Sequence, residues 1–179
     1  MFNQINYDPP IVFFSGANRT NSGQRKDSTT NVEETGEFVV NMATYALREK
    51  VSATARFVDP EVDEFEIAGL TKLPSTLVRP PRVAESPIHL ECRYHSTLTL
   101  PANRRQSLHH VVIGKVVGIH IRDDVITAEG NIDIKKVRPL ARLGYLDYTS
   151  VTEVFTMKAE GNAAGQIGEA VAAREKVMQ

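Results

Sequence analysis

The segment from residue 15 to residue 31 contains residue types that bind an anion. It reads SGANRTNSGQRKDSTTN, which predicts a strand end, then a polar loop, then the start of a helix. Its cations and hydroxyl groups include Arg19, Arg25, Lys26, Ser28 and Thr29. The first N–H groups of a helix lack intrahelical partners and carry a partial positive charge, so they attract anions. The segment therefore predicts a cradle for a phosphate monoester, and an exposed loop with scattered charges is the alternative.

Other motifs of catalysis or metal binding are absent from the sequence. It contains no Ser-His-Asp order and no HExxH, Walker A or GxGxxG pattern. The single cysteine, Cys92, excludes an internal disulfide, and no Cys/His cluster has zinc spacing. Cys92 lies on the apolar face of a predicted strand, so we expect a buried, inert thiol. We predict no metal site, and nucleophilic and zinc-hydrolase chemistry are unsupported.

Length, charge and hydropathy limit the remaining function classes. A chain of 179 residues fits one domain. Its 21 Lys and Arg against 22 Asp and Glu leave a net charge of −1, which argues against binding to nucleic acid or to a membrane surface. No apolar run reaches about 18 residues, and the opening MFNQINYDPP lacks the features of a secretory signal. We expect a soluble, cytoplasmic protein.

The elements that position the anion-binding segment are predicted on either side of it. Residues 11–15 (IVFFS) predict a short strand, and the Gly and Asn residues that follow predict a loop. Asp27 or Ser28 is expected to cap a helix that runs to about Thr35, with Gly36 in the left-handed position after its end. Two further elements are predicted, a buried strand at 38–40 and a covering helix at 42–54.

The second half of the chain is predicted to be mainly β-structure. Asp63 and Gly69 mark the start and the end of a short helix, and the proline-rich stretch 74–87 is expected to be extended. Strands are predicted at 88–100, at 109–121, around Ile132 and Ile134, and at 149–157.

Alternation in the two long strands indicates how each one is buried. Alternate positions from Ile88 to Tyr94 are apolar, which is typical of a half-buried strand. In 109–121 the odd positions are mostly apolar, and Gly114 and Gly118 on the other face leave room for a backbone or a ligand. At least five strands with short helices between them predict a mainly β fold, a small antiparallel barrel with helical cover.

Five blocks of sequence follow one another in a characteristic order. The first is DPPIVFFSGANRTNSGQRKDSTTNVEETGEFVVN, residues 8–41, which contains PP.V.FS, KD[ST]..N and TGEFVVN. The others are VDEFEIAGLT (62–71), PPRVAESPIHLEC (80–92), HHVVIGKVVGIHI (109–121) and PLARLGYLDYT (139–149). Together they resemble flavin reductase-like proteins of the FMN-binding split-barrel superfamily. The resemblance covers about residues 1–158, so we expect one such domain there and a C-terminal helix or flexible tail at 159–179.

The resemblance implies an antiparallel FMN-binding split β-barrel with helical cover, usually a homodimer with FMN near the dimer interface. The phosphate-contacting positions of the family fall on Ser15, Arg25, Lys26, Asp27, Ser28 and Thr29. Lys26, Ser28 and Thr29 suit an anion by their own chemistry. Asp27 is expected instead to cap the helix and to leave its backbone N–H to the phosphate.

A second cofactor-binding group is expected at Arg142 and Gly144. A glycine beside an aromatic residue and an arginine after a proline turn could lie along an isoalloxazine edge, and the family supports this placement. The alternative is that Arg142 ties a strand end and Tyr145 packs in the core; many members of the family have a second glycine where this chain has Tyr145. His109 and His110 precede a strand, and reductases of this superfamily often have a histidine near such a strand.

The resemblance implies a flavin reductase-like oxidoreductase that transfers hydride from NAD(P)H to FMN. In such an enzyme the protein need not supply an acid, a base or a nucleophile, so we predict no catalytic residue. One alternative is an FMN-binding electron carrier or flavin-storage protein without nicotinamide-dependent activity, and another is a barrel that has lost its flavin. The family has FFN-like residues and a strand-rich segment before DPP. We therefore also expect a shortened N-terminal region and weak FMN binding.

Overall fold

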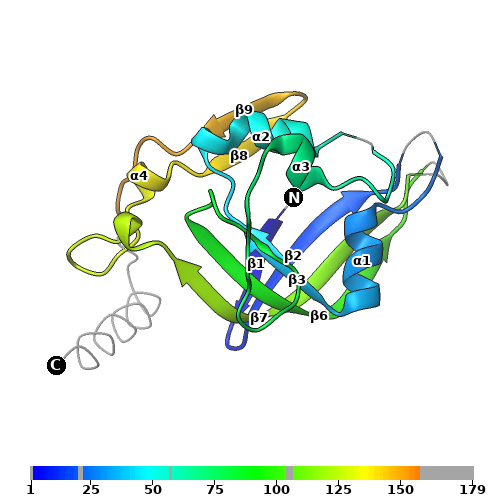
Figure 1. Cartoon of the computed structure of the whole chain (residues 1–179), viewed down its shortest axis with the longest axis horizontal. Helices are drawn as coiled ribbons and strands as arrows, with labels where there is room; N and C mark the ends of the chain where they lie inside the picture. The colour runs from blue at the N-terminus through cyan, green and yellow to red at the C-terminus, as the bar shows by residue number, and fades with distance from the viewer. Residues whose placement is uncertain (1, 20–21, 57, 104–106, 158–179) are drawn as a thin grey trace.

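An antiparallel sheet of five strands forms the centre of the protein (Figure 1). The structure is a computed structural model and describes residues 2–19, 22–56, 58–103 and 107–157. The strands follow the order β1-β2-β7-β6-β3 across the sheet, and each neighbouring pair is antiparallel. Their bounds are β1 (Phe2–Tyr7), β2 (Pro10–Ala17), β3 (Glu37–Asn41), β6 (Ile88–Leu100) and β7 (His109–Ile121). The mainly β, antiparallel fold is as predicted.

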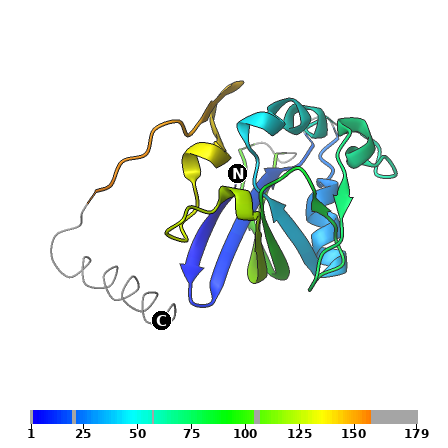
Figure 2. The same cartoon turned by 60° about the vertical axis from the view of Figure 1, so that its left-hand side comes forward.

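Short helices and two small hairpins connect or cover the strands. The helices are α1 (Asp27–Thr35), η1 (Tyr45–Leu47), α2 (Arg48–Thr54), α3 (Glu64–Ala68), η2 (Asp123–Val125) and α4 (Ile134–Val137). The hairpins pair β4 (Lys72–Leu73) with β5 (Arg82–Val83), and β8 (Leu140–Gly144) with β9 (Asp147–Ser150). Figure 2 shows α1, α2 and α3 grouped on one side of the sheet, which is the helical cover expected from the sequence.

The main core lies between α1 and the sheet. Its buried residues come from β2, α1, β3, β6 and β7, and they are Val12, Val32, Phe38, Cys92, Val112 and Val116. The core positions of β7 are thus even-numbered, whereas the odd-numbered Ile119 is 59% exposed. Gly114 does leave room on the even face, but for a side chain rather than for a backbone or a ligand. A Cβ atom on Gly114 would lie 2.4 Å from the ring of Phe38.

The first half of β6 is buried on both faces, which differs from the half-buried strand predicted. Glu91 and Cys92 are neighbours, and neither has any exposed surface. The register between β6 and β7 shifts between these two residues because β7 has one extra residue there, Val117, so Glu91 and Cys92 still point to opposite faces of the sheet. The Glu91 carboxylate accepts hydrogen bonds from the N–H groups of Thr76 (2.8 Å) and Leu77 (2.5 Å) and from His120 Nε2 (2.5 Å). A buried carboxylate therefore holds the extended stretch before β5 against the sheet.

Two predicted elements are shorter in the structure than expected. The helix expected at 42–54 starts later, as η1 followed by α2, because Thr44 is extended and bridges to Pro139. The strand expected at 149–157 ends at Ser150, where β8 no longer offers a partner. The bridge at Thr44 fastens the base of the β8–β9 hairpin to the segment that follows β3.

The strand expected around Ile132 and Ile134 is absent. Ile132 forms only an isolated bridge with Ile126, and Ile134 is the first residue of α4. The Asp133 carboxylate accepts a hydrogen bond from the Lys136 N–H at 3.0 Å and so caps this helix. The local capping interaction outweighs the apolar alternation from which the strand was predicted.

The short helix α3 begins and ends where the sequence predicted. Asp63 accepts a hydrogen bond from the Phe65 N–H at 2.9 Å, and Gly69 is left-handed with φ of 58°. None of the helices in the described part of the chain has both the length and the apolar character needed to cross a lipid bilayer. The helix or tail expected at 159–179 lies outside the described residues.

Candidate functional site

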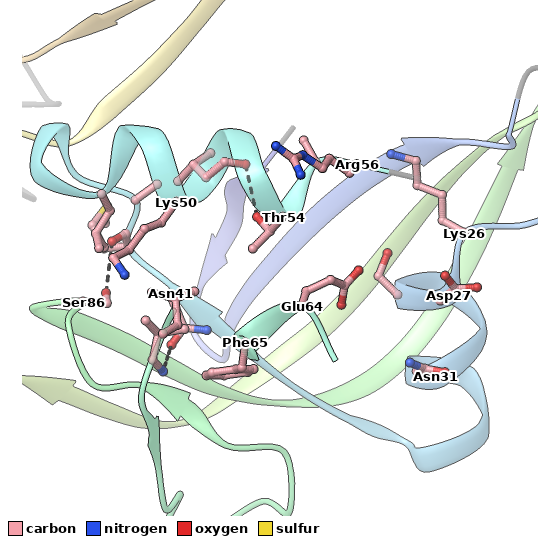
Figure 3. A pocket seen from close by; sticks show the side chains of 18 of the residues that line it. Lys26, Asp27, Asn31, Asn41, Lys50, Thr54, Arg56, Glu64, Phe65 and Ser86 are labelled. Carbon is pink, nitrogen blue, oxygen red and sulfur yellow. Dashed lines mark hydrogen bonds between the residues drawn. The ribbon is translucent and has the colours of Figure 1, made fainter. Parts of the chain in front are cut away.

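A cavity of about 490 Å³ lies between the start of α1, the end of β3 and the helices α2 and α3 (Figure 3). We call the part lined by Lys26, Asp27, Ser28 and Asn31 the polar end. The part that we call the apolar end is lined by Met42, Leu47, Val51, Phe65, Leu70 and Val83. The cavity therefore has two chemically different ends.

The polar end is formed by the first turns of α1. Lys26 occupies the N-cap position in an extended conformation, and its side chain forms no capping hydrogen bond. The prediction that Asp27 or Ser28 caps the helix is wrong, because both residues already belong to its first turn. A helix start without a side-chain cap keeps unpaired N–H groups and a partial positive charge. These groups lie beside the cavity, where an anion can accept hydrogen bonds from them.

Three side chains at the polar end have no hydrogen-bond or ion-pair partner among the described residues. They are those of Lys26, Ser28 and Asn31, of which the last two lie about one helical turn apart. The Lys26 stem lies 3.4 Å from the position that a Cβ would occupy on Gly16, so the end of β2 leaves room for it. An ammonium group, a hydroxyl and an amide at this end of the cavity supply the charge and the kinds of hydrogen-bond donor that phosphate oxygens accept.

Arg19 and Asp27 form an ion pair at the edge of the polar end. Arg19 Nη2 lies 2.6 Å from Asp27 Oδ2 and donates to the Val58 carbonyl at 3.0 Å. The pair connects the first turn of α1 to the segment between α2 and α3. Because Arg19 balances the Asp27 carboxylate, that carboxylate repels an anion at the helix start less strongly.

The apolar end is enclosed by α2, α3 and the segment after β3. Lys50 on α2 donates hydrogen bonds to the carbonyls of Ala68 and Gly69 at the end of α3, so the two helices are held together. Apolar walls with few polar groups are typical of sites that bind a flat aromatic molecule. The apolar end therefore fits an aromatic ring system, just as the polar end fits a phosphate.

Three of the predicted phosphate-binding residues do not line this cavity. Ser15 lies on β2 beside β7. Arg25 forms a two-pronged ion pair with Glu33, with both N–O distances at 2.7 Å, and the hydrogen bond from Arg25 lowers the pKa of the Glu33 carboxyl. Thr29 is only 2% exposed. The remaining three predicted residues are brought together at the polar end.

Arg142 and Gly144 lie on the β8–β9 hairpin and do not line the cavity either. Arg142 donates to the Tyr145 carbonyl at 3.2 Å, and its guanidinium lies 6.0 Å from the centre of the Tyr148 ring. Tyr145 is 95% exposed and has φ of 48°, a left-handed conformation that glycine adopts more readily. The alternative that Tyr145 packs in the core is therefore wrong. The contact of Arg142 and Gly144 with a flavin stays a prediction.

Two other residues singled out in the sequence are buried and are not part of the cavity lining. Cys92 is fully buried, and burial raises the pKa of its thiol to about 12, which fits the predicted inert thiol. His110 Nε2–H donates to Asn18 Oδ1 at 2.9 Å, its Nδ1 accepts from the Thr99 hydroxyl at 3.2 Å, and burial lowers the pKa of its ring. Among the residues that the structure describes, no group of three or more His, Cys, Asp or Glu side chains could hold a metal ion.

Sequence reasoning did not single out several cavity residues. Asn31 is the last residue of the KD[ST]..N element, and its spacing from Ser28 places both on one helix face, so it could have been found. Asn41 is the last residue of the TGEFVVN element, so it could also have been found from the sequence. Arg56 and Glu64 come from the α2–α3 region, and only the tertiary structure brings them to the cavity.

Solved structures with the same fold define the class of protein. Component B of nitrilotriacetate monooxygenase from Bacillus cereus superposes with a TM-score of 0.79 at 29% identity, covering 87% of this chain and 76% of that one. Flavoredoxin of Desulfovibrio vulgaris (Miyazaki F) superposes with a TM-score of 0.72 at 20% identity, covering 90% and 80% of the two chains. The fold is the antiparallel split β-barrel.

The sequence assigns the family within this class. The sequence model of the flavin reductase like domain matches residues 1–143, and the chain belongs to that family. An uncharacterized protein of Aquifex aeolicus is 36% identical over 143 residues, which are 80% of this chain and 69% of that protein. YwrF of Bacillus subtilis, also uncharacterized, is 31% identical over 157 residues, which are 87% of this chain and 76% of YwrF.

Proposed function

We propose that the protein binds FMN in the cavity and acts as a flavin reductase that uses NAD(P)H. The observation that carries this proposal is the start of α1, which has no side-chain cap and has beside it three polar side chains without a partner among the described residues. They lie at one end of a cavity whose other end is apolar. Membership of the flavin reductase-like family supports it. When bound, the flavin supplies the hydride acceptor, and the residues of this chain bind and orient it.

The phosphate of FMN would be held at the polar end. Lys26 supplies the charge, Ser28 and Asn31 supply hydrogen-bond donors, and the first N–H groups of α1 complete the set. The isoalloxazine ring would lie at the apolar end, where the walls exclude water from its faces. Arg19 supports the site indirectly by balancing the charge of Asp27.

We include a homodimer in the proposal because apolar side chains are exposed both on the sheet and on the β8–β9 hairpin. On β6 and β7 these are Leu98, Leu100 and Ile119, and on the β8–β9 hairpin they are Leu143, Tyr145, Leu146 and Tyr148. Exposed apolar surface of this kind is typical of an interface. In this proposal a second copy covers the hairpin, and Arg142 and Gly144 contact the flavin near the dimer interface. Sedimentation of the wild type and of Leu146→Glu tests this, with a dimer and a monomer as the expected results.

Titration with FMN, followed by rapid mixing with NADH or NADPH, tests the proposed activity. We expect FMN to bind to the protein, and we expect the absorption band of the bound flavin to bleach when either nicotinamide is added. A bound flavin that neither nicotinamide bleaches would instead indicate an electron carrier or a storage protein. Failure to bind FMN at all would contradict the proposal. We place the activity in the cytoplasm, since a chain with one cysteine suits a reducing compartment.

A further inference from the structure

Asn41 is the last residue of β3, and its side-chain amide lies at the apolar end of the cavity. Its Oδ1 atom accepts a hydrogen bond from the Val83 N–H at 2.8 Å. Because only the oxygen of the amide can accept from an N–H group, this contact fixes which way the amide faces. In Figure 3 the amide nitrogen of Asn41 points toward the middle of the cavity, between Ser86 and Glu64.

Val83, whose N–H orients Asn41, is also held through its carbonyl. His89 lies opposite Asn41 in the β3–β6 ladder, and its Nε2–H donates to the Val83 carbonyl at 2.8 Å. His89 is only 4% exposed, and burial lowers the pKa of its ring. One buried side chain thus holds the carbonyl of Val83 while the N–H of Val83 holds Asn41. A chain of two hydrogen bonds restrains the amide more than either bond alone.

The other polar side chains around the apolar end use their protons within the protein. The Ser86 hydroxyl lies 3.0 Å from the carbonyls of Met42 and Ile88, and the Thr54 hydroxyl donates to the Val51 carbonyl at 3.1 Å. The Lys50 ammonium is engaged at the end of α3. No described residue accepts a hydrogen bond from Asn41 Nδ2, so this amide is a fixed donor that faces the cavity.

We propose that Asn41 is a positioning and tuning residue for the flavin: its Nδ2 donates a hydrogen bond to an acceptor atom of the isoalloxazine ring, and His89 and Val83 hold it ready to do so. This inference rests on the proposed binding of FMN. The ring gains electrons when it is reduced, so a fixed donor beside one of its acceptor atoms stabilises the reduced form more than the oxidised form. Asn41 therefore raises the reduction potential of the bound flavin.

The variant Asn41→Asp isolates the donor. A carboxylate oxygen still accepts from the Val83 N–H, but the second oxygen replaces the donor with an acceptor. We expect the affinity for oxidised FMN and for riboflavin to fall about tenfold, the loss of one hydrogen bond. We expect the affinity for reduced FMN to fall by at least about a further factor of ten. This difference lowers the two-electron potential of bound FMN by about 30 mV.

Lys26→Ala serves as the matched variant at the polar end. It should weaken FMN binding while leaving riboflavin, which has no phosphate, bound as in the wild type. Asn41→Asp should weaken both ligands and shift the potential, and Asn41→Ala takes its place if thermal melting shows that the Asp variant is unfolded. Unchanged riboflavin affinity together with an unchanged potential would overturn the role of Asn41. A wild-type protein that binds neither flavin would instead overturn the proposed function.

Discussion

The two ends of the cavity differ in how the chain builds them. The polar end comes from a few consecutive residues around the start of one helix, and its donors are presented by the helix geometry itself. The apolar end combines positions as distant in sequence as Met42, Phe65 and Val83. It also depends on buried contacts behind it, because Glu91 and His89 hold the stretch that includes Val83.

The local and the long-range parts of this one site should therefore respond differently to mutation. A change at Lys26, Ser28 or Asn31 removes a ligand contact and leaves the fold intact, since these three side chains have no partner among the described residues. A change behind the apolar end removes buried hydrogen bonds and reduces stability before it reduces binding.

Glu91→Ala should have the largest effect. The substitution leaves the N–H groups of Thr76 and Leu77 and the ring of His120 without their buried partner, so we expect the free energy of unfolding to fall by about 3 kcal/mol. Urea denaturation measures this, with the exposed Glu49→Ala as the control. A loss no greater than that of Glu49→Ala would show that the buried carboxylate does not support the apolar end.

The same carboxylate predicts a pH dependence of stability. Burial by itself raises the pKa of Glu91, but the hydrogen bonds from Thr76, Leu77 and His120 outweigh it and hold the pKa below its usual value. A lowered pKa in the folded state means that the stabilisation is present above the unfolded-state pKa and is lost as the pH falls through the folded-state pKa. We expect Glu91→Gln to lose less stability than the wild type on acidification below the normal glutamate range. An equal loss of unfolding free energy in the two proteins as the pH falls would contradict this.

Lys26→Ala should weaken FMN binding by about 1.5 to 3 kcal/mol, the range for a charge-assisted hydrogen bond. Its effect on the free energy of unfolding should be small, because the side chain has no described partner. Titration of apo-protein at moderate salt measures the first effect, and thermal melting without ligand measures the second. An unchanged dissociation constant would remove Lys26 from the polar end.

Cys92→Ser tests the core that lies behind both ends. A buried hydroxyl replaces a thiol among apolar neighbours, so we expect a loss of stability on the order of 1 to 3 kcal/mol. The folded fraction should still bind flavin, because Cys92 does not line the cavity. Native wild-type protein should resist maleimide, as burial raises the pKa of the thiol to about 12. Rapid labelling of the folded protein would contradict a structural role.

Arg25→Ala should have the smallest effect, although Arg25 is next to Lys26 in the sequence. Its guanidinium already pairs with Glu33 near the surface, and pairs of this kind contribute about 1 kcal/mol or less. We expect FMN affinity to change less than threefold, which corresponds to less than about 0.7 kcal/mol. A loss as large as that of Lys26→Ala would show that Arg25 turns toward the phosphate when the ligand binds.

The sequence by itself determined the elements whose causes are local. The extent of α1 and the cap and end of α3 follow from single residues at fixed spacing, and the long strands follow from apolar alternation. The polar end of the cavity could be predicted for the same reason, because Lys26 and Ser28 are adjacent to the helix start that they serve. Local causes are visible in a sequence because the interacting groups are close along the chain.

Only the tertiary structure decided which face of each strand is buried and which groups meet across the fold. Gly114 makes room for Phe38. The stretch at residues 76–77 covers and buries Glu91, although alternation assigns Glu91 to the polar side. The orientation of Asn41 depends on Val83, forty-two residues further along the chain. These features depend on strand register and on packing between distant segments. Neither leaves a periodic pattern in the sequence.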